Sequence, residues 1–83
     1  MSDFQPPVAA RTIDTSGTLC PRPIVETARA IRLLAAGEVL CVVATDPGIQ
    51  TDMPMWCRST RHEHLATVRD GKAWRSYVRK RAG

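Results

Sequence analysis

The run Cys20-Pro21-Arg22-Pro23 contains a sulfur nucleophile at the expected start of a helix. If Cys20 lies at or just before the N-cap, Pro21 falls at the first helical position, where its fixed φ suits the helix and its missing N–H costs nothing. Pro23 then stiffens the first turn as well. Arg22 precedes a proline and is therefore biased away from helical angles, so the same pattern allows a distorted first turn.

This placement favours a thiolate at Cys20. A helix N-terminus offers unpaired backbone N–H groups and the positive end of the helix dipole, and Arg22 supplies a nearby permanent cation. Such surroundings lower the pKa of a cysteine from about 8.5 to roughly 3.5–7.5. We therefore predict a lowered pKa for Cys20, and the same setting would stabilise a persulfide anion.

The other two cysteines read as structural. An odd number of widely spaced cysteines does not suggest a disulfide framework, so free thiols are expected. Cys41 lies inside an apolar run, which predicts a buried residue. Cys57 could line the core or face the start of the first helix, and the core is favoured. A lone cysteine is more often a small hydrophobe than a nucleophile, so the residues alone leave both readings of Cys20 open.

No metal site or cofactor is expected. Cys57, His62 and His64 are close in sequence, but there is no C-x-x-C pair and the spacing matches no usual zinc signature. A Gly-rich phosphate loop, a Ser/His/Asp set and paired carboxylates are also absent from the pattern. Three acidic residues read simply as a helix-face residue, a turn residue and a helix cap: Glu26, Asp46 and Asp52.

The charge balance favours acidic partners without naming them. The chain has 12 basic and 8 acidic residues, which gives a net charge of +4. Five arginines on the two expected helices could form an RNA-binding surface: Arg22, Arg29, Arg32, Arg58 and Arg61. A charge-dotted helix face is usually only solvated, and two Trp, one Tyr and one Phe are too few for a base-stacking platform. Direct nucleic-acid binding is therefore not expected.

The length of 83 residues predicts one small domain, residues 11–83, after a flexible N-terminal tail, residues 1–10. The apolar runs are too short to span a bilayer, and the start of the chain lacks a signal pattern. These features predict a cytoplasmic protein without membrane contact, and we expect a monomer when free.

The elements that must position Cys20 follow from local patterns. We predict a strand over 11–14, a turn at Gly17, a helix over 21–36 ended by Gly37, a buried strand in "EVLCVVAT" and a second helix over 52–60 capped by Asp52. Pro54 would lie in the first turn of that second helix. Two further strands flank an Asp70-Gly71 hairpin turn.

The resulting order is β-α-β-α-β-β. It predicts an α/β (α+β) two-layer sandwich, a four-stranded mixed sheet with two helices on one face. In the last strand Trp74, Ser76 and Val78 alternate with residues 75, 77 and 79, so one face should meet the helices and the other should be solvated.

The segment "GTLCPRPIVET", Gly17 to Thr27, resembles the motif of the TusA-like (SirA-like) sulfur-carrier family. The resemblance extends over "LLAAGEVLCVVATDPG", "TDMPMWCRSTRHEHL" and "YVRK". It implies that Cys20 carries persulfide sulfur, with Gly17, Pro21, Arg22 and Pro23 as the supporting motif. It also implies that the protein is a sulfurtransferase-type persulfide carrier without a cofactor, rather than a stand-alone catalyst.

The same resemblance implies partners. The donor would be a cysteine desulfurase or a rhodanese-type protein, and the acceptor would be a sulfur-relay protein for tRNA thiolation, molybdenum-cofactor enzymes or sulfur oxidation. Two alternatives stay open: a non-enzymatic module that docks an acidic protein or RNA through its arginine-bearing helices, and a thiol redox protein that pairs Cys20 with Cys57.

Overall fold

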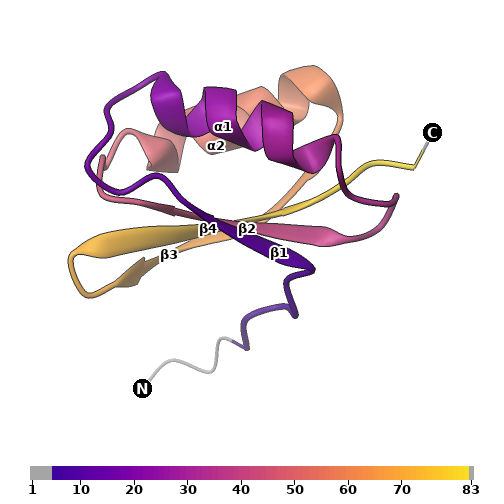
Figure 1. The fold of residues 1–83 in the computed structure, drawn as a ribbon, viewed down its shortest axis with the longest axis horizontal. Coiled ribbons are helices and arrows are strands. Elements are labelled where there is room, and N and C mark those ends of the chain that lie inside the picture. Colours follow the sequence, from indigo (N-terminus) through magenta and orange to yellow (C-terminus); the bar gives the residue numbers. More distant parts are fainter. Residues whose placement is uncertain (1–4, 83) are drawn as a thin grey trace.

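The computed structural model describes residues 5–82, which form one sheet and two helices. In chain order the elements are β1 (Arg11–Asp14), α1 (Arg22–Ile31), β2 (Val39–Ala44), α2 (Ile49–Thr60), β3 (Glu63–Asp70) and β4 (Ala73–Arg79). The strand order is β1-β2-β4-β3, in which β1 is parallel to β2 and the other pairs are antiparallel. Both helices cover the same face (Figure 1). The predicted two-layer α+β fold and its element order are confirmed.

The main core lies between the helix layer and the sheet. Each element that contributes to it turns one apolar face inward, as the helical and strand periodicities require. Its buried residues are Ala30, Ile31, Leu34, Leu40, Val42, Ala44, Ile49, Met53, Cys57 and Val78. Complete burial of a Leu or Met side chain contributes about 1.5–3 kcal/mol, so this layer holds α1 and α2 against the sheet.

The opposite face of the sheet carries a second, smaller cluster. Tyr77 is only 6% exposed there, packed with Val39 and Cys41 of the neighbouring strand. The register places Tyr77 directly beside Cys41. The prediction that residues 75, 77 and 79 form a solvated face is therefore wrong at Tyr77, because its ring covers apolar side chains of β2.

The N-terminal residues reach this second cluster. Ala9 packs against it, and the Ala10 N–H donates to the Val39 carbonyl at 2.8 Å. Residues 1–4 of the predicted tail lie outside the described residues. Within residues 5–82 no helix is long and apolar enough to cross a membrane.

Helix α1 is shorter than predicted. It ends at Ile31, whereas the apolar pattern suggested residue 36. The next turn is tighter, because the N–H groups of Leu33 and Leu34 bond to carbonyls three residues back. The Lys80 ammonium then donates to the Leu34 carbonyl at 2.5 Å. A side chain from a strand end distant in sequence thus satisfies a carbonyl of the turn that follows α1.

Helix α2 begins at Ile49, three residues before the predicted start. The Asp46 carboxylate accepts the Gly48 N–H at 3.0 Å, and the Ile49 N–H donates to the Asp46 carbonyl at 3.2 Å, so this turn leads straight into the helix. Asp52 is consequently a first-turn residue and not the N-cap. Pro54 falls inside the helix and not in its first turn.

The β3–β4 hairpin is confirmed, but its loop is Gly71–Lys72 and not Asp70-Gly71. Asp70 still pairs with Ala73 across the two strands. The φ angle of Gly71 is +62°, which a two-residue hairpin of type II′ requires at its first central position. The sequence pattern therefore located the hairpin, and the ladder extended one residue further than expected.

Candidate functional site

Cys20 lies on the loop that joins β1 to α1, and its thiol is exposed. The loop occupies one end of the molecule (Figure 1). Hydrogen bonds to β2 and its end hold the loop: the Thr15 hydroxyl donates to the Val43 carbonyl at 2.7 Å, and the Gly17 N–H donates to the Thr45 hydroxyl at 2.8 Å. Gly17 has a φ of +81°, a conformation that glycine adopts without steric cost. The loop is thus a fixed support for the sulfur.

The start of α1 differs slightly from the predicted arrangement. Pro21 is the N-cap and Arg22 is the first helical residue, so Cys20 lies just before the cap and Pro23 in the first turn. The bond between Cys20 and Pro21 is cis. The Arg22 N–H donates to the Leu19 carbonyl at 2.8 Å, and Pro23 is buried. The helix therefore starts directly after the Cys20-Pro21 pair and is not broken by it.

Two carboxylates from the second crossover surround Cys20. The Cys20 N–H donates to Asp46 Oδ2 at 2.9 Å, and the Cys20 thiol hydrogen-bonds the Asp52 carboxylate. The hydrogen bond to Asp52 raises the pKa of Cys20, and desolvation and the negative charges of Asp52 and Asp46 raise it further. The predicted lowering of this pKa is therefore wrong, because the carboxylates oppose the effect of the helix N-terminus.

Arg22 does not offset these carboxylates. Its guanidinium pairs with Glu26, one turn along α1, at 3.4 Å. The short distance in sequence between Cys20 and Arg22 suggested a cation beside the sulfur, but the Arg22 side chain pairs with a residue one turn further along the helix. In the resting protein the Cys20 sulfur is accordingly a hydrogen-bonded thiol, and Asp52 is positioned to accept its proton.

Asp46 has a structural part in this arrangement. The N–H groups of Gly48 and Cys20 donate to its carboxylate and lower its pKa. One side chain thus connects the start of α2 to the Cys20 loop. Because a carboxylate that accepts backbone N–H bonds is stabilised in its charged form, Asp46 holds a negative charge near the sulfur at neutral pH.

Sequence reasoning named Asp46 and Asp52 only as turn and cap residues. A topological signal could have found them. Strands β1 and β2 are parallel, so the loop after β1, which carries Cys20, and the turn after β2, which carries Asp46, leave the sheet at the same edge.

The remaining predicted sulfur and imidazole groups lie elsewhere. Cys41 and Cys57 are 1% and 2% exposed, as predicted for structural residues, and burial raises the pKa of Cys57 to about 11. His62 stacks on Trp56 with ring centroids 5.3 Å apart, and His64 bonds the Thr67 hydroxyl at 2.7 Å. Within residues 5–82 no three His, Cys, Asp or Glu side chains gather as metal ligands would.

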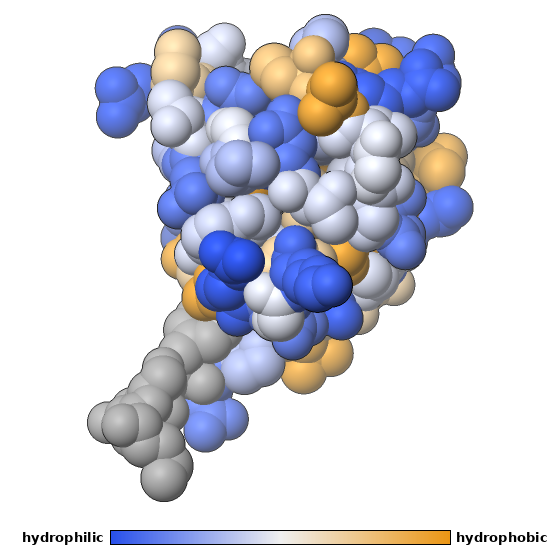
Figure 2. Space-filling model, turned by 90° about the vertical axis from the view of Figure 1, so that its left-hand side faces the viewer, coloured by the Kyte–Doolittle hydropathy of each residue, from blue (hydrophilic) through white to orange (hydrophobic). Residues whose placement is uncertain are grey.

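Exposed apolar side chains accompany the charged groups near Cys20. Leu19, which directly precedes the sulfur, is exposed, and so is Val25 on α1. Figure 2 shows this end of the molecule, where hydrophobic side chains are interspersed among hydrophilic ones. Mixed surfaces of this kind are typical of transient protein contacts.

The comparisons with known proteins agree with this geometry. Residues 11–80 match the family described as Sulfurtransferase TusA. The chain is 37% identical over 82 residues to the sulfur carrier protein TusA of Pseudomonas putida strain GB-1, and the match covers 99% of both chains. It is 43% identical over 72 residues to the YrkF protein of Bacillus subtilis, which corresponds to 87% of this chain and 39% of that protein.

A solved structure shares the fold. A crystal structure of a SirA-like protein from Desulfitobacterium hafniense superposes with a TM-score of 0.74 at 19% identity, and the match covers 87% of this chain and 99% of that one. This likeness supports the architecture. The family match over residues 11–80 and the 37% identity to a TusA protein over nearly the whole chain show that the chain belongs to the TusA sulfurtransferase family.

Proposed function

We propose that this protein carries sulfur as a persulfide on Cys20 and relays it between two other proteins. The observation that carries the proposal is the contrast among its three free thiols, since Cys20 is exposed and Cys41 and Cys57 are buried. The proposal is supported by relatives that are named sulfur carriers. The family match, which spans residues 11–80, supports residues 11–83 as the carrier domain.

The chemistry is a transpersulfidation without net oxidation. The Cys20 sulfur attacks the terminal sulfur of a donor persulfide, a new S–S bond forms, and the donor's S–S bond breaks. The cysteine sulfur of the donor leaves as a thiolate and takes up a proton. The thiol proton of Cys20 passes to Asp52 or to water. Delivery repeats the step in reverse order, with an acceptor thiolate attacking the terminal sulfur held on Cys20.

The neighbouring residues then have distinct positioning parts. Pro21, Pro23 and Gly17 hold the shape of the presenting loop, and Asp46 fastens the Cys20 backbone. In the persulfide the terminal sulfur stands about 2 Å beyond the Cys20 sulfur, which moves the reacting atom toward a docked partner. Arg22, paired with Glu26, contributes to docking more than to anion stabilisation.

The partners that this chemistry requires are a protein that presents a persulfide and a protein that presents an acceptor thiolate. A cysteine desulfurase or a rhodanese-type protein satisfies the first requirement, and a sulfur-relay protein satisfies the second. Membership of the TusA family does not favour the alternative of a non-enzymatic binding module.

The test is the intact mass of the wild-type protein and of Cys20→Ser after incubation with a cysteine desulfurase and cysteine, or with inorganic polysulfide. We expect the wild type to gain the mass of one sulfur atom, a reductant to remove that mass, and Cys20→Ser to gain none. An equal gain in both proteins, or no gain with either donor, would contradict the proposal. Cys57→Ala is the matched control and should load as the wild type does.

A further inference from the structure

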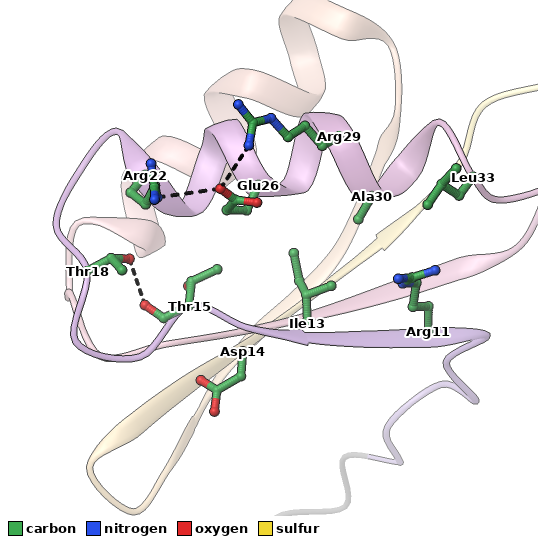
Figure 3. A pocket seen from close by; sticks show the side chains of 10 residues that line it. All are labelled: Arg11, Ile13, Asp14, Thr15, Thr18, Arg22, Glu26, Arg29, Ala30 and Leu33. Atoms are coloured by element: carbon green, nitrogen blue, oxygen red, sulfur yellow. Dashed lines mark hydrogen bonds and ion pairs between the residues drawn. The ribbon is translucent and has the colours of Figure 1, made fainter.

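A cleft of about 420 Å³ lies between strand β1 and helix α1, beside the Cys20 loop. We refer to it as the β1–α1 cleft. Figure 3 shows its apolar part, formed by Ile13 of the strand and Ala30 of the helix, and its guanidinium groups, which belong to Arg11, Arg22 and Arg29. Groove walls of this size and mixture suit a segment of another polypeptide.

The charges in the β1–α1 cleft are unbalanced. Glu26 is shared between Arg22 at 3.4 Å and Arg29 at 3.5 Å, and Arg11 takes part in none of the ion pairs formed within residues 5–82. Asp14, whose backbone borders the cleft, points its carboxylate away (Figure 3). Three guanidinium groups thus face one carboxylate, and an occupant that brings carboxylates would complete the pairing.

The cleft also runs along a free sheet edge. In the order β1-β2-β4-β3, strand β1 is an edge strand, and among the strands of residues 5–82 it pairs with β2 alone, so its other side can pair with an added strand. The opposite edge, β3, is interrupted by an irregularity between His64 and Ala66, which is a common device for blunting an edge. Strand β1 keeps a regular register with β2 and can accept an added strand.

Its position ties the β1–α1 cleft to the sulfur. Thr18 and Arg22 line the cleft, and they stand two residues before and two residues after Cys20. A strand laid along β1 would therefore end close to the loop that presents the thiol. In such a strand alternate side chains face the helix layer, so carboxylates at every second position could meet Arg11 and Arg29, while the apolar residues between them face the other side of the sheet.

We infer that the β1–α1 cleft receives an extended acidic segment of the protein that exchanges sulfur with Cys20, by pairing with the β1 edge and with Arg11 and Arg29. This inference rests on the proposed carrier function. It names a partner by its chemistry, an extended chain with alternating acidic and apolar residues. It also explains why cations cluster on this flank of α1, whereas carboxylates surround the sulfur itself.

The first test uses a short fluorescein-labelled peptide in which glutamate and valine alternate, titrated with the full-length protein by fluorescence anisotropy. We expect saturable binding that weakens with salt, together with NMR shifts of the amides of 11–14. A peptide with lysine in place of glutamate should not bind. A peptide methylated on every backbone nitrogen should not bind either, since it keeps the carboxylates but cannot pair with the strand.

The second test changes the protein. Arg11→Glu and Arg29→Glu should each weaken binding of the glutamate peptide by about tenfold, because charge reversal replaces an attraction by a repulsion. Arg58→Glu, an exposed arginine of α2 outside the cleft, is the matched control and should bind as the wild type does. Equal binding by all variants, or equal binding of the methylated peptide, would overturn the inference.

A second copy of this chain is the other possible occupant of the β1 edge. Concentration-dependent dimerisation through the amides of 11–14, without peptide binding, would assign the edge to a second copy of this chain and overturn the inference. Loading of Cys20 by inorganic polysulfide requires no docked peptide. A failure of the cleft inference would therefore leave the mass gain on Cys20 intact, and a failure of the carrier function would be seen in that mass measurement alone.

Discussion

The backbone N–H of Cys20 donates to the carboxylate of Asp46 at 2.9 Å, across 26 positions of sequence. This bond joins the loop after β1 to the turn after β2, so the sulfur is held by both crossovers of the fold. A neighbouring carboxylate, Asp52, accepts a hydrogen bond from the thiol. The site therefore combines a fixed backbone with an acidic environment, which keeps the resting sulfur protonated.

Asp52→Asn should make Cys20 more reactive toward alkylation at neutral pH. The carboxylate raises the pKa of Cys20, so a neutral amide should lower that pKa and shift the onset of alkylation to lower pH. The rate of iodoacetamide modification, measured against pH by mass spectrometry, checks this.

Glu63→Gln is the matched control for that variant, since Glu63 pairs with Arg79 on β4. Its alkylation profile should match the wild type. An Asp52→Asn profile that coincides with the wild type would show that this carboxylate does not govern the thiol.

Asp46 should make the free energy of unfolding depend on pH in the acidic range. The pKa of Asp46 is held below its ordinary value of 3.8 by the N–H groups of Gly48 and Cys20. A carboxyl whose pKa is lower in the folded chain stabilises the fold above its unfolded pKa, and that stabilisation is lost as the pH falls through the folded pKa. Urea unfolding of the wild type should therefore show declining stability below about pH 4.

The Asp46→Asn variant should have a lower free energy of unfolding than the wild type at neutral pH. That free energy should also fall less in the variant when the pH is lowered. Asp14, whose pKa is lowered by hydrogen bonds with Ser16, also titrates in this range and leaves a residual decline in the variant. Identical acid profiles for the two proteins would show that Asp46 contributes nothing to this dependence.

The extent to which sequence predicted this fold follows from how local each signal is. The β1 bounds, the β2 run and the hairpin around Gly71 depend on neighbouring residues, and they were found. The end of α1 was misplaced because the tighter turn that follows Ile31 is held partly by Lys80, which is distant in sequence and donates to the Leu34 carbonyl. The burial of Tyr77 depends on Cys41 of the adjacent strand and carried no local signature.

In the site, too, local features were predictable from the sequence and contacts between distant residues were not. Cys20 was predicted from a proline pattern and an expected helix start, both local features. The sign of its pKa shift was wrong because Asp46 and Asp52 approach it only through the parallel pairing of β1 and β2. Arg22, only two residues from Cys20, pairs instead with Glu26. Charges around a site are set by tertiary structure, and sequence proximity is a poor guide to them.

Native alkylation should mark one cysteine only. Cys57 is buried and its pKa is raised to about 11, and Cys41 is only 1% exposed, so iodoacetamide should reach neither sulfur in the folded protein. Iodoacetamide applied to the folded protein should add one group, on Cys20, and denaturant should allow three. Two or three adducts on the folded protein would contradict the burial of the other thiols.

Met53→Ala should destabilise the fold strongly. Met53 is 0% exposed in the core beneath the helices, and truncation of such a side chain costs about 2–5 kcal/mol. Met55→Ala is the matched control on the same helix, since Met55 is 62% exposed and should change the free energy of unfolding by less than about 0.5 kcal/mol. Urea unfolding of both variants checks the pair, and equal losses would contradict the assigned faces of α2.

The measurement that decides the carrier function is the location of the transferred sulfur. After a single turnover with a cysteine desulfurase and ³⁵S-labelled cysteine, the protein is trapped with iodoacetamide, digested and sequenced by tandem mass spectrometry. We predict the labelled sulfur on the peptide that contains Cys20, with fragment ions that place it on that residue and its loss on addition of an acceptor thiol. Label on Cys41 or Cys57, or label that no thiol can remove, would contradict a persulfide relay through Cys20.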